Sequence, residues 1–288
     1  MDIAARRLPA FLVLLGLPAV ALAQSMPTTQ PNFLQIIRED VKVGRGADHA
    51  RIEAGWPAAF EKAKSPYTYL AMTSLSGPTE AWFVSPFESQ AAMGEAMKME
   101  DEPALSAELT RLQRADAEVV NSVRILQARA RTELSHGSFP DLQKQRFWEI
   151  SIFRMRPGRE AAFAAAAKAY GAALGRSGAD VGFRVYEVMA GMPGPTYLVF
   201  STATTYADFD KMLAADQAVM KAFTPEDGQI FDKFSEGAIN IESHRFRLSP
   251  EMSYVPKEVR AQDPAFWMPK KPATKPAAPA AAKPSSQP

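Results

Sequence analysis

The stretch that decides the fold is Gly77-Pro78-Thr79-Glu80-Ala81-Trp82-Phe83-Val84-Ser85, because the chain contains a close copy of it, Gly194-Pro195-Thr196-Tyr197-Leu198-Val199-Phe200-Ser201. In each copy, Gly and Pro mark a turn, and the β-branched and aromatic residues that follow are typical of a strand. Another strand-like run precedes each turn, at residues 67–75 and 183–189. The sequence therefore predicts two similar β-hairpins, and a repeated hairpin indicates a repeated fold.

The elements on either side of the first hairpin follow from apolar spacing and from turn residues. Gly44-Arg45-Gly46 ends the first strand and separates it from a helix. In chain order, the sequence predicts a strand at 33–43, a helix at 47–62, the hairpin, helical segments at 86–99 and 103–120, and a strand at 122–134. The predicted order is strand, helix, strand, strand, helix, strand.

The second part of the chain repeats this order. It is predicted to hold a strand at 148–156, a helix at 160–174, the second hairpin, a helical region at 206–234 that is broken near Thr224-Pro225, and a strand at 238–248. Corresponding residues lie at similar offsets: Gly44 matches Gly158 at 158 − 44 = 114, and Ile125 matches Ile241 at 241 − 125 = 116. Such similar offsets across a whole unit indicate duplication.

The fold class predicted from this order is α+β. Two tandem units of this kind are the ferredoxin-like motif written twice, at residues 33–134 and 148–249. Because each unit leaves one face of its sheet uncovered, the two repeats are expected to pack sheet to sheet as a single-chain α/β barrel.

The strand ends Val41-Lys42-Val43-Gly44 and Met155-Arg156-Pro157-Gly158, together with the two Gly-Pro-Thr hairpins, carry a resemblance to a known family. The chain resembles the dimeric α/β-barrel superfamily with its two subunits fused, over most of residues 33–249. The resemblance implies the fold. It does not imply one function, because this superfamily includes oxygenases, isomerases, haem enzymes and proteins of unknown role.

The first 23 residues have the pattern of a signal peptide. Arg6 and Arg7 precede an apolar run at residues 8–20, and Ala21-Leu22-Ala23 is a small-residue cleavage site. The apolar run is shorter than the roughly 20 residues that a membrane span needs. The sequence therefore predicts a periplasmic or secreted protein that begins near Gln24 and has no membrane span in its mature form.

Composition narrows the classes of partner. A formal net charge of +1 gives no basic excess for a nucleic-acid surface, so no nucleic-acid partner is expected. The absence of cysteine excludes disulfides and thiolate chemistry. Residues 256–288 are rich in Pro, Ala and Lys and are predicted to be a disordered tail. A weak contact between the lysines of this tail and the cell wall is the alternative interpretation.

The candidate site lies where the two repeats differ. At the offset of 114, Glu39 and His49 take the positions of Phe153 and Phe163. Glu39 has the strand parity of apolar neighbours, so it is expected to face the helix that carries His49. A buried carboxylate and imidazole are costly unless they pair, and a pair of this kind can act as a general base. We therefore predict Glu39 and His49 as catalytic residues.

Four further residues are predicted to bind a ligand beside this pair. Glu53 lies one helical turn after His49, and the aromatic walls of the pocket are expected to come from Trp56, Tyr69 and Trp82. Under the alternative interpretation, His49 and Glu53 are solvated at the margin of the helix and Glu39 bonds to nearby backbone. No metal is predicted, because the three histidines and the acidic residues lie far apart along the chain.

Three functions are compatible with these features. The first is binding of a small apolar or aromatic molecule in the first repeat, without catalysis. The second is a cofactor-independent oxygenase or isomerase that acts on a phenolic or quinone-like substrate, with Glu39 and His49 taking the proton. The third is a structural or envelope-stress protein. No cofactor is predicted, because no phosphate-binding loop, dinucleotide fingerprint or nucleophile elbow occurs in the sequence.

Overall fold

A computed structural model describes residues 26–268 of the chain. Residues 33–134 hold the first half of the fold. Its elements are β1 (Phe33–Val41), α1 (Gly46–Glu53), α2 (Gly55–Lys62), β2 (Leu70–Ser74), β3 (Glu80–Phe87), α3 (Gln90–Glu100), α4 (Pro103–Asp116), β4 (Val120–Ala130) and a short 3-10 helix, η1 (Thr132–Leu134). The predicted signal peptide lies outside the described residues.

The second half repeats this order with fewer breaks. Its elements are β5 (Phe147–Met155), α5 (Glu160–Ser177), β6 (Arg184–Ala190), β7 (Thr196–Ala203), α6 (Asp208–Ala222), α7 (Pro225–Gly237) and β8 (Ala238–Leu248). Proline begins α4 and α7, where a missing N–H costs nothing. Thr224 and Asp227 add a capping box that fixes the start of α7.

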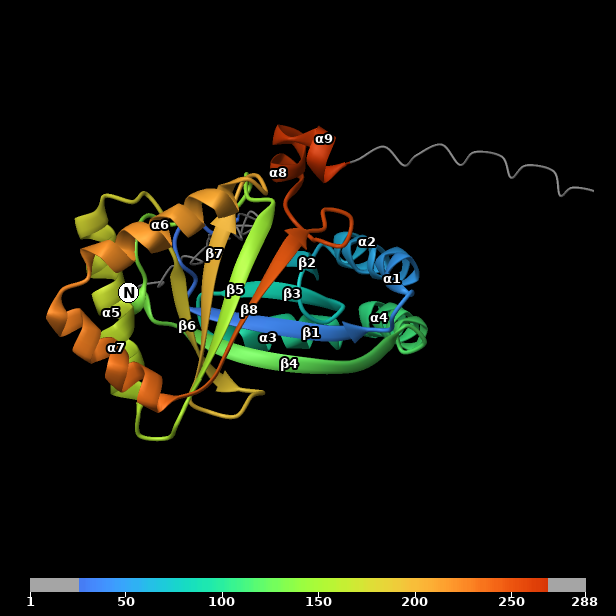
Figure 1. Ribbon diagram of the computed structural model, residues 1–288. Coiled ribbons are helices and arrows are strands. Elements are labelled where there is room, and N and C mark those ends of the chain that lie inside the picture. The colour runs from blue at the N-terminus through green and yellow to red at the C-terminus, as the bar shows by residue number, and fades with distance from the viewer. Residues whose placement is uncertain (1–25, 269–288) are drawn as a thin grey trace, which may run out of the picture.

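The strands form one closed barrel in the order β1-β3-β2-β8-β5-β7-β6-β4. All neighbouring strands run antiparallel. The halves are joined twice, where β2 pairs with β8 and where β4 pairs with β6. Helices α5, α6 and α7 gather outside one half of the barrel, and α1 to α4 lie outside the other (Figure 1). The predicted α+β barrel is therefore confirmed.

The interior of the barrel is a single apolar core to which both halves contribute. Trp82 and Phe246 meet at its centre, with their ring centroids 5.1 Å apart. The buried side chains around them alternate along each strand with side chains that face the helices. Outside the barrel, each half therefore has its own second layer of side chains between the sheet and the helices. The candidate site lies in the second layer of the first half.

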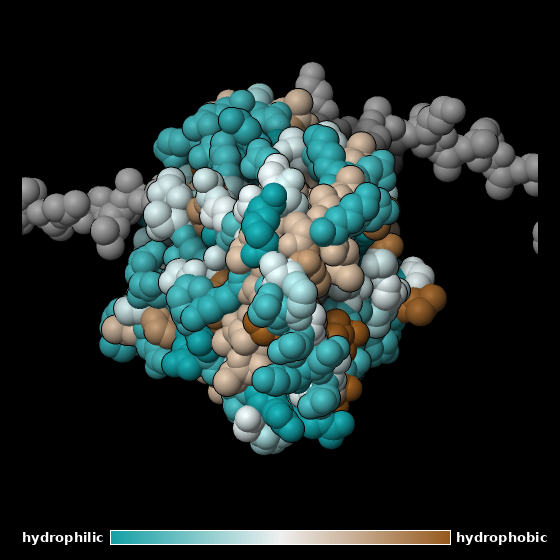
Figure 2. Space-filling model, turned by 60° about the vertical axis from the view of Figure 1, so that its left-hand side comes forward, coloured by the Kyte–Doolittle hydropathy of each residue, from teal (hydrophilic) through white to brown (hydrophobic). Residues whose placement is uncertain are grey.

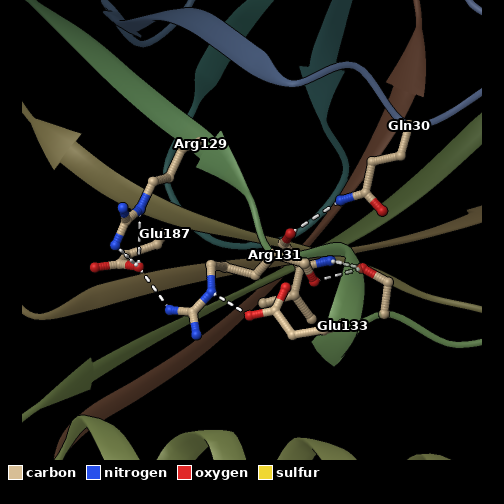
Figure 3. Close-up of polar contacts among 7 residues, drawn as sticks. Gln30, Arg129, Arg131, Glu133 and Glu187 are labelled. Carbon is tan, nitrogen blue, oxygen red and sulfur yellow. Dashed lines mark hydrogen bonds and ion pairs between the residues drawn. The ribbon is translucent and has the colours of Figure 1, made fainter.

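The junction between β4 and β6 is reinforced by charged side chains (Figure 3). Glu187 accepts from Arg129 at 2.8 Å and from Arg131 at 2.7 Å, and Arg131 also reaches Glu133 at 2.6 Å. Gln30 donates to the backbone oxygen of Val185 at 3.0 Å, so the segment before β1 is tied to the second half. Because these ion pairs are partly exposed, they are expected to add little to the stability of the fold.

The surface on the side of the second half is mostly hydrophilic, with a weakly hydrophobic stripe across it (Figure 2). Alanine-rich α5 packs between α6 and α7 on this half. The outer faces of β4 and β8 carry exposed β-branched side chains, including Val123, Ile239 and Ile241. None of the helices in residues 26–268 is both long and apolar enough to cross a membrane.

The offset between the halves grows along the chain. Glu39 pairs with Val123 and Phe153 pairs with Ile241, so the last strands match at 241 − 123 = 118. The predicted match of Ile125 with Ile241 is therefore wrong by two residues. Between the first and the last strand, the second half is 118 − 114 = 4 residues longer than the first. These extra residues increase the offset between corresponding residues of the two halves.

The predicted helix at 47–62 is two helices, α1 and α2, which meet at Ala54. Pro57 has no N–H to donate to the carbonyl oxygen of Glu53, so the helical ladder is interrupted there. Gly55 lies against α4: a Cβ at this position would be 2.5 Å from Cδ2 of Leu112. The break thus lets α2 approach α4 and turns the end of α1 towards it.

Residues 256–268, the first part of the tail that was predicted to be disordered, are folded in the structure. Residues 257–262 and 264–267 form the short helices α8 (Lys257–Gln262) and α9 (Pro264–Trp267). Val259 and Trp267 are buried against the barrel core, and Lys257 and Arg260 pair with Glu61 on α2. The composition of residues 256–288 is dominated by Pro, Ala and Lys, so it does not reveal the few side chains that anchor these two helices. Residues 269–288 lie outside the described part of the chain.

Gly77, which opens the first hairpin turn, is expected to tolerate substitution poorly. Its φ is +77°, and an added Cβ would lie 2.4 Å from Nδ1 of His244. Gly158 has a similar φ of +82° but no atom within 4 Å of an added Cβ. We expect Gly158→Ala to cost about 1–2 kcal/mol, from backbone strain alone. Gly77→Ala should cost about 1–3 kcal/mol more, because overpacking adds to that strain. Urea unfolding of both variants measures the difference, and equal losses would contradict the close contact.

Candidate functional site

Four buried polar residues meet between the first-half sheet and its helices. Nε2 of His49 on α1 lies 2.8 Å from Oε2 of Glu39 on β1 and 3.7 Å from Oδ1 of Asp116 at the end of α4. Glu53, the last residue of α1, completes the group, and one ligand atom from each residue lies within 4.8 Å of the others. The residues are 7% (Glu39), 1% (His49), 3% (Glu53) and 6% (Asp116) exposed. The solvated alternative is therefore wrong.

Local structure explains how these side chains come together. Glu39 shares the helix-facing side of β1 with Ile37 and Val41, as strand parity predicts. His49 and Glu53 are four residues apart on α1 and so lie on one face of it. Asp116 sits in the last turn of α4, where the helix dipole disfavours a carboxylate. Helical preference alone does not account for an acid at that position.

Burial and neighbouring charge raise the pKa of two of the three carboxyl groups, those of Glu53 and Asp116. Burial, with help from the charges of Glu39 and Asp116, raises the pKa of Glu53 to about 9. Burial and Glu39 also raise the pKa of Asp116 to about 6, while His49 acts in the opposite direction. The indole N–H of Trp56 is near enough to lower the pKa of Glu53 slightly, although it does not reach hydrogen-bond geometry. The site thus holds three buried acidic groups, and no lysine or arginine among the described residues pairs with them.

The same place in the second half is an aromatic cluster. Phe163 stacks on Tyr197 with centroids 3.8 Å apart, and Phe153 lies 5.5 Å from Phe163 and 6.0 Å from Phe234. Glu39 and His49 occupy the positions of Phe153 and Phe163, as predicted from the sequence.

Asp116 is the member of the site that the sequence comparison missed. The backbone N–H of Lys42 bonds to the oxygen of Val119, and that of Arg156 bonds to the oxygen of Gly237. Asp116 and Phe234 each lie three residues before these acceptors, so they correspond at the offset of 118. The incorrect offset of 116 pairs Asp116 with Asp232 and hides the difference. A third aromatic ring of the second half is therefore an acid in the first.

Two smaller replacements complete the contrast. Glu53 corresponds to Ala167 at the offset of 114, and Ala81 corresponds to Tyr197 at the offset of 116 that the hairpin pairing gives. The first half therefore has an alanine where the second half has its stacked tyrosine. The layers between sheet and helices are otherwise equivalent in the two halves. Substitutions at these positions give the first-half layer both its open space and its polar groups.

A cavity of about 230 Å³ opens beside the cluster, and Glu39 and Glu53 form part of its wall. Its other walls are mainly aromatic rings and methionines: Trp56, Phe60, Tyr67, Tyr69, Phe83, Phe87, Met93, Met97, Met99 and Tyr254. Trp56 and Tyr69 lie where they were predicted. Trp82 does not: it faces the barrel interior, and its neighbour Phe83 takes the place on the wall. Trp82 and Phe83 are adjacent on β3 and therefore lie on opposite faces of the sheet.

Several buried polar atoms in this region have no hydrogen-bond partner among the described residues. They are Oε1 of Glu53, Nε1 of Trp56, the hydroxyl oxygen of Tyr69 and Oδ1 of Asp116. Buried polar atoms in folded proteins are nearly always bonded. Because burial raises the pKa of Tyr69 well above its usual value, its hydroxyl stays protonated and can donate.

Separation along the chain was the reason to expect no metal, and that reason does not hold. The fold brings one histidine together with three carboxylates from β1, α1 and α4. His136 and His244 lie elsewhere: His136 stacks on Phe183, and His244 bonds to Glu242 at 3.2 Å.

Comparison with known proteins leaves the family open. No family model matches the chain, and no curated protein matches it. Among solved structures, a candidate monooxygenase from Fusobacterium nucleatum subsp. nucleatum is 8% identical, with 76% of this chain and 92% of that chain covered and a TM-score of 0.51. At this identity the likeness supports the dimeric α/β-barrel type of fold, and the fold alone.

Two other solved structures are similar over much of the chain. An anthrone oxidase-like protein is 9% identical, with 78% of this chain and 94% of that chain covered and a TM-score of 0.46. Chlorite dismutase from Candidatus Nitrospira defluvii is 11% identical, with 81% and 96% covered and a TM-score of 0.47.

Proposed function

We propose that this protein binds a small aromatic molecule with a polar substituent, of the phenol or quinone type, in the first-half cavity. The observation that carries this proposal is a pocket with aromatic and methionine walls and unpartnered polar atoms from Glu53, Trp56 and Tyr69 at its edge. An apolar site with a few convergent polar groups is the usual form of a small-molecule site.

The size and chemistry of the cavity narrow the ligand class. A cavity of about 230 Å³ lies just below the roughly 300–1,000 Å³ of drug-sized sites, so a molecule of one or two rings suits it. Met93, Met97 and Met99 supply adaptable apolar contacts. The indole of Trp56 and the hydroxyl of Tyr69 can donate to a phenol or carbonyl oxygen.

The test uses 1-naphthol as the probe, with binding followed by calorimetry. Tyr69→Phe removes only the hydroxyl, and losing one hydrogen bond of about 0.5–1.5 kcal/mol should raise the Kd roughly 2- to 13-fold. Tyr206→Phe, which changes an exposed tyrosine of the second half, is the matched control and should leave the Kd unchanged.

A second cavity, of about 370 Å³, lies at the equivalent place in the second half, where Tyr170 donates to Asp216. Tyr170→Phe therefore serves as a further arm of the naphthol experiment. If this variant binds more weakly while Tyr69→Phe binds like wild type, the first-half site is refuted.

Catalysis is the second candidate function, and the buried 2.8 Å contact between His49 and Glu39 favours it. The carboxylate would orient the ring, and the ring would take a proton from a phenolic substrate. Turnover that persists after chelation of metals, and that His49→Gln abolishes, would support this cofactor-independent alternative over binding alone.

We also propose that the protein acts after export. The basic n-region, the apolar run and Ala21-Leu22-Ala23 support this. The mature chain should begin near Gln24 and be found in the periplasmic fraction of a bacterial host. Mass spectrometry of the purified protein measures its N-terminus, and an intact Met1 on the mature protein would refute export with cleavage.

A further inference from the structure

We propose that Glu39, His49, Glu53 and Asp116 form a binding site for one divalent first-row transition-metal ion. The proposed ligand set is one imidazole nitrogen and three carboxylates, held by β1, α1 and α4. The proposal does not depend on an organic ligand in the cavity.

The geometry is close to what an ion requires. Nitrogen and oxygen ligands lie about 2.0–2.2 Å from Zn²⁺, so two ligands of one ion are at most about 4.4 Å apart. The four ligand atoms here lie within 4.8 Å of one another, and Nε2 of His49 is 2.8 Å from Glu39 and 3.7 Å from Asp116. The spread of 4.8 Å exceeds this limit by only about 0.4 Å, so the proposed site requires a small adjustment of the side chains around the ion.

Charge balance is the second support. Elsewhere, partly buried carboxylates meet arginine, as Glu80 meets Arg38 at 2.8 Å and Glu187 meets Arg131 at 2.7 Å. In the cluster, no lysine or arginine is paired with Glu39, Glu53 or Asp116 among the described residues. Burying a charge without a partner is costly, and a bound cation removes that cost.

The unpartnered oxygens point independently to a ligand. Glu53 and Asp116 are each more than nine-tenths buried, and each has one carboxyl oxygen without a hydrogen-bond partner. Oδ1 of Asp116 lies 3.7 Å from Nε2 of His49, which is beyond hydrogen-bond distance. These oxygens are placed to coordinate rather than to pair within the protein.

The internal repeat shows that the fold itself does not need these groups. The equivalent positions of the second half hold three phenylalanines and an alanine, which belong to an apolar layer that lines the second cavity. Four polar residues have replaced that layer as a set. A set of ligands for one ion accounts for this better than four independent structural roles.

The donor atoms indicate the class of ion. Carboxylates suit hard cations, whereas an imidazole favours Zn²⁺, Fe²⁺ or Mn²⁺ over Ca²⁺ and Mg²⁺. Because Glu39 and Glu53 are also part of the cavity wall, an ion between them would lie beside the cavity.

The test starts from full-length mature protein treated with EDTA and dialysed against Zn²⁺, Mn²⁺ or Co²⁺. Metal analysis should find one ion per chain, and Co²⁺ should give visible absorption bands. Glu53→Gln and His49→Gln each remove a proposed ligand, so each should weaken binding by at least the roughly 10- to 100-fold that loss of a residue supporting a ligand costs. Glu100→Gln is the matched control, because Glu100 lines the same cavity outside the cluster, and it should bind like wild type.

Thermal unfolding of each variant without metal shows whether it is folded. A folded wild type that takes up no ion, or folded Glu53→Gln and His49→Gln that bind like wild type, overturns the proposal. Titration with 1-naphthol on EDTA-treated and metal-loaded protein keeps the two proposals separate. Retained naphthol binding without metal uptake refutes only the metal site, and metal uptake without naphthol binding refutes only the organic ligand.

Discussion

A variant that copies the second half into the first, Glu39→Phe, His49→Phe, Glu53→Ala and Asp116→Phe, is expected to be more stable than metal-free wild type and to bind no metal. Replacing a buried ionic group by packed apolar side chains is often neutral or stabilising by about 1–4 kcal/mol. Urea unfolding of EDTA-treated protein gives the change in the free energy of unfolding. Metal analysis after dialysis gives the loss of binding.

The gain depends on space for the new rings. Ala81 stands opposite the new rings where the second half has Tyr197, so the layer is not overfilled. The control is Glu39→Gln with Asp116→Asn, which removes charge but keeps side-chain shape, and it should lose metal binding without the gain in stability. A loss of more than about 2 kcal/mol in the four-residue variant, comparable to the usual cost of overpacking, would mean that the polar groups hold this half together.

The reverse change has the opposite sign. Phe234→Asp places one carboxylate in the aromatic cluster of the second half, where Phe153 and Phe163 offer no polar partner. It removes the contacts of a buried ring and leaves a buried charge unpaired. We expect a loss of at least about 3–5 kcal/mol in the free energy of unfolding.

Urea unfolding at neutral pH measures this loss, with Phe234→Leu as the apolar control, which should lose much less. A loss below about 1 kcal/mol for Phe234→Asp would show that a lone carboxylate is solvated at this depth. The two halves would then differ in how far water reaches these positions, and not in whether they can hold a buried carboxylate.

The sequence predicted those features that depend on local patterns. Turn residues and strand composition located both hairpins, and strand parity placed Glu39 facing the helices. The offset of 114 is reliable near the start of each unit, because few residues separate Glu39 from His49. The heart of the site was therefore predictable from the internal repeat.

Two features were not predicted correctly. The role of Asp116 depends on the extra residues that accumulate along the second half, and the placement of Trp82 and Phe83 depends on which face of β3 each residue occupies. The four extra residues of the second half fall before its last strand, so the match of Asp116 with Phe234 required the strand pairing. Trp82 and Phe83 are adjacent aromatic residues on opposite faces of β3, and composition does not distinguish which faces the cavity. Sequence spacing also gives no sign that three chain segments converge on His49.

The position of β8 has a consequence for how the chain folds. This last strand lies between β5 and β2, where it pairs Leu248 with Met72, residues that are 248 − 72 = 176 apart. Such a contact carries a large loop-closure cost, and folds rich in contacts of this kind fold slowly. Until β8 is in place, β2 has an unpaired edge and the apolar face around Trp82 is open. We therefore expect the pairing of β8 with β2 to form late in folding, and the partly folded chain before that step to be prone to aggregation.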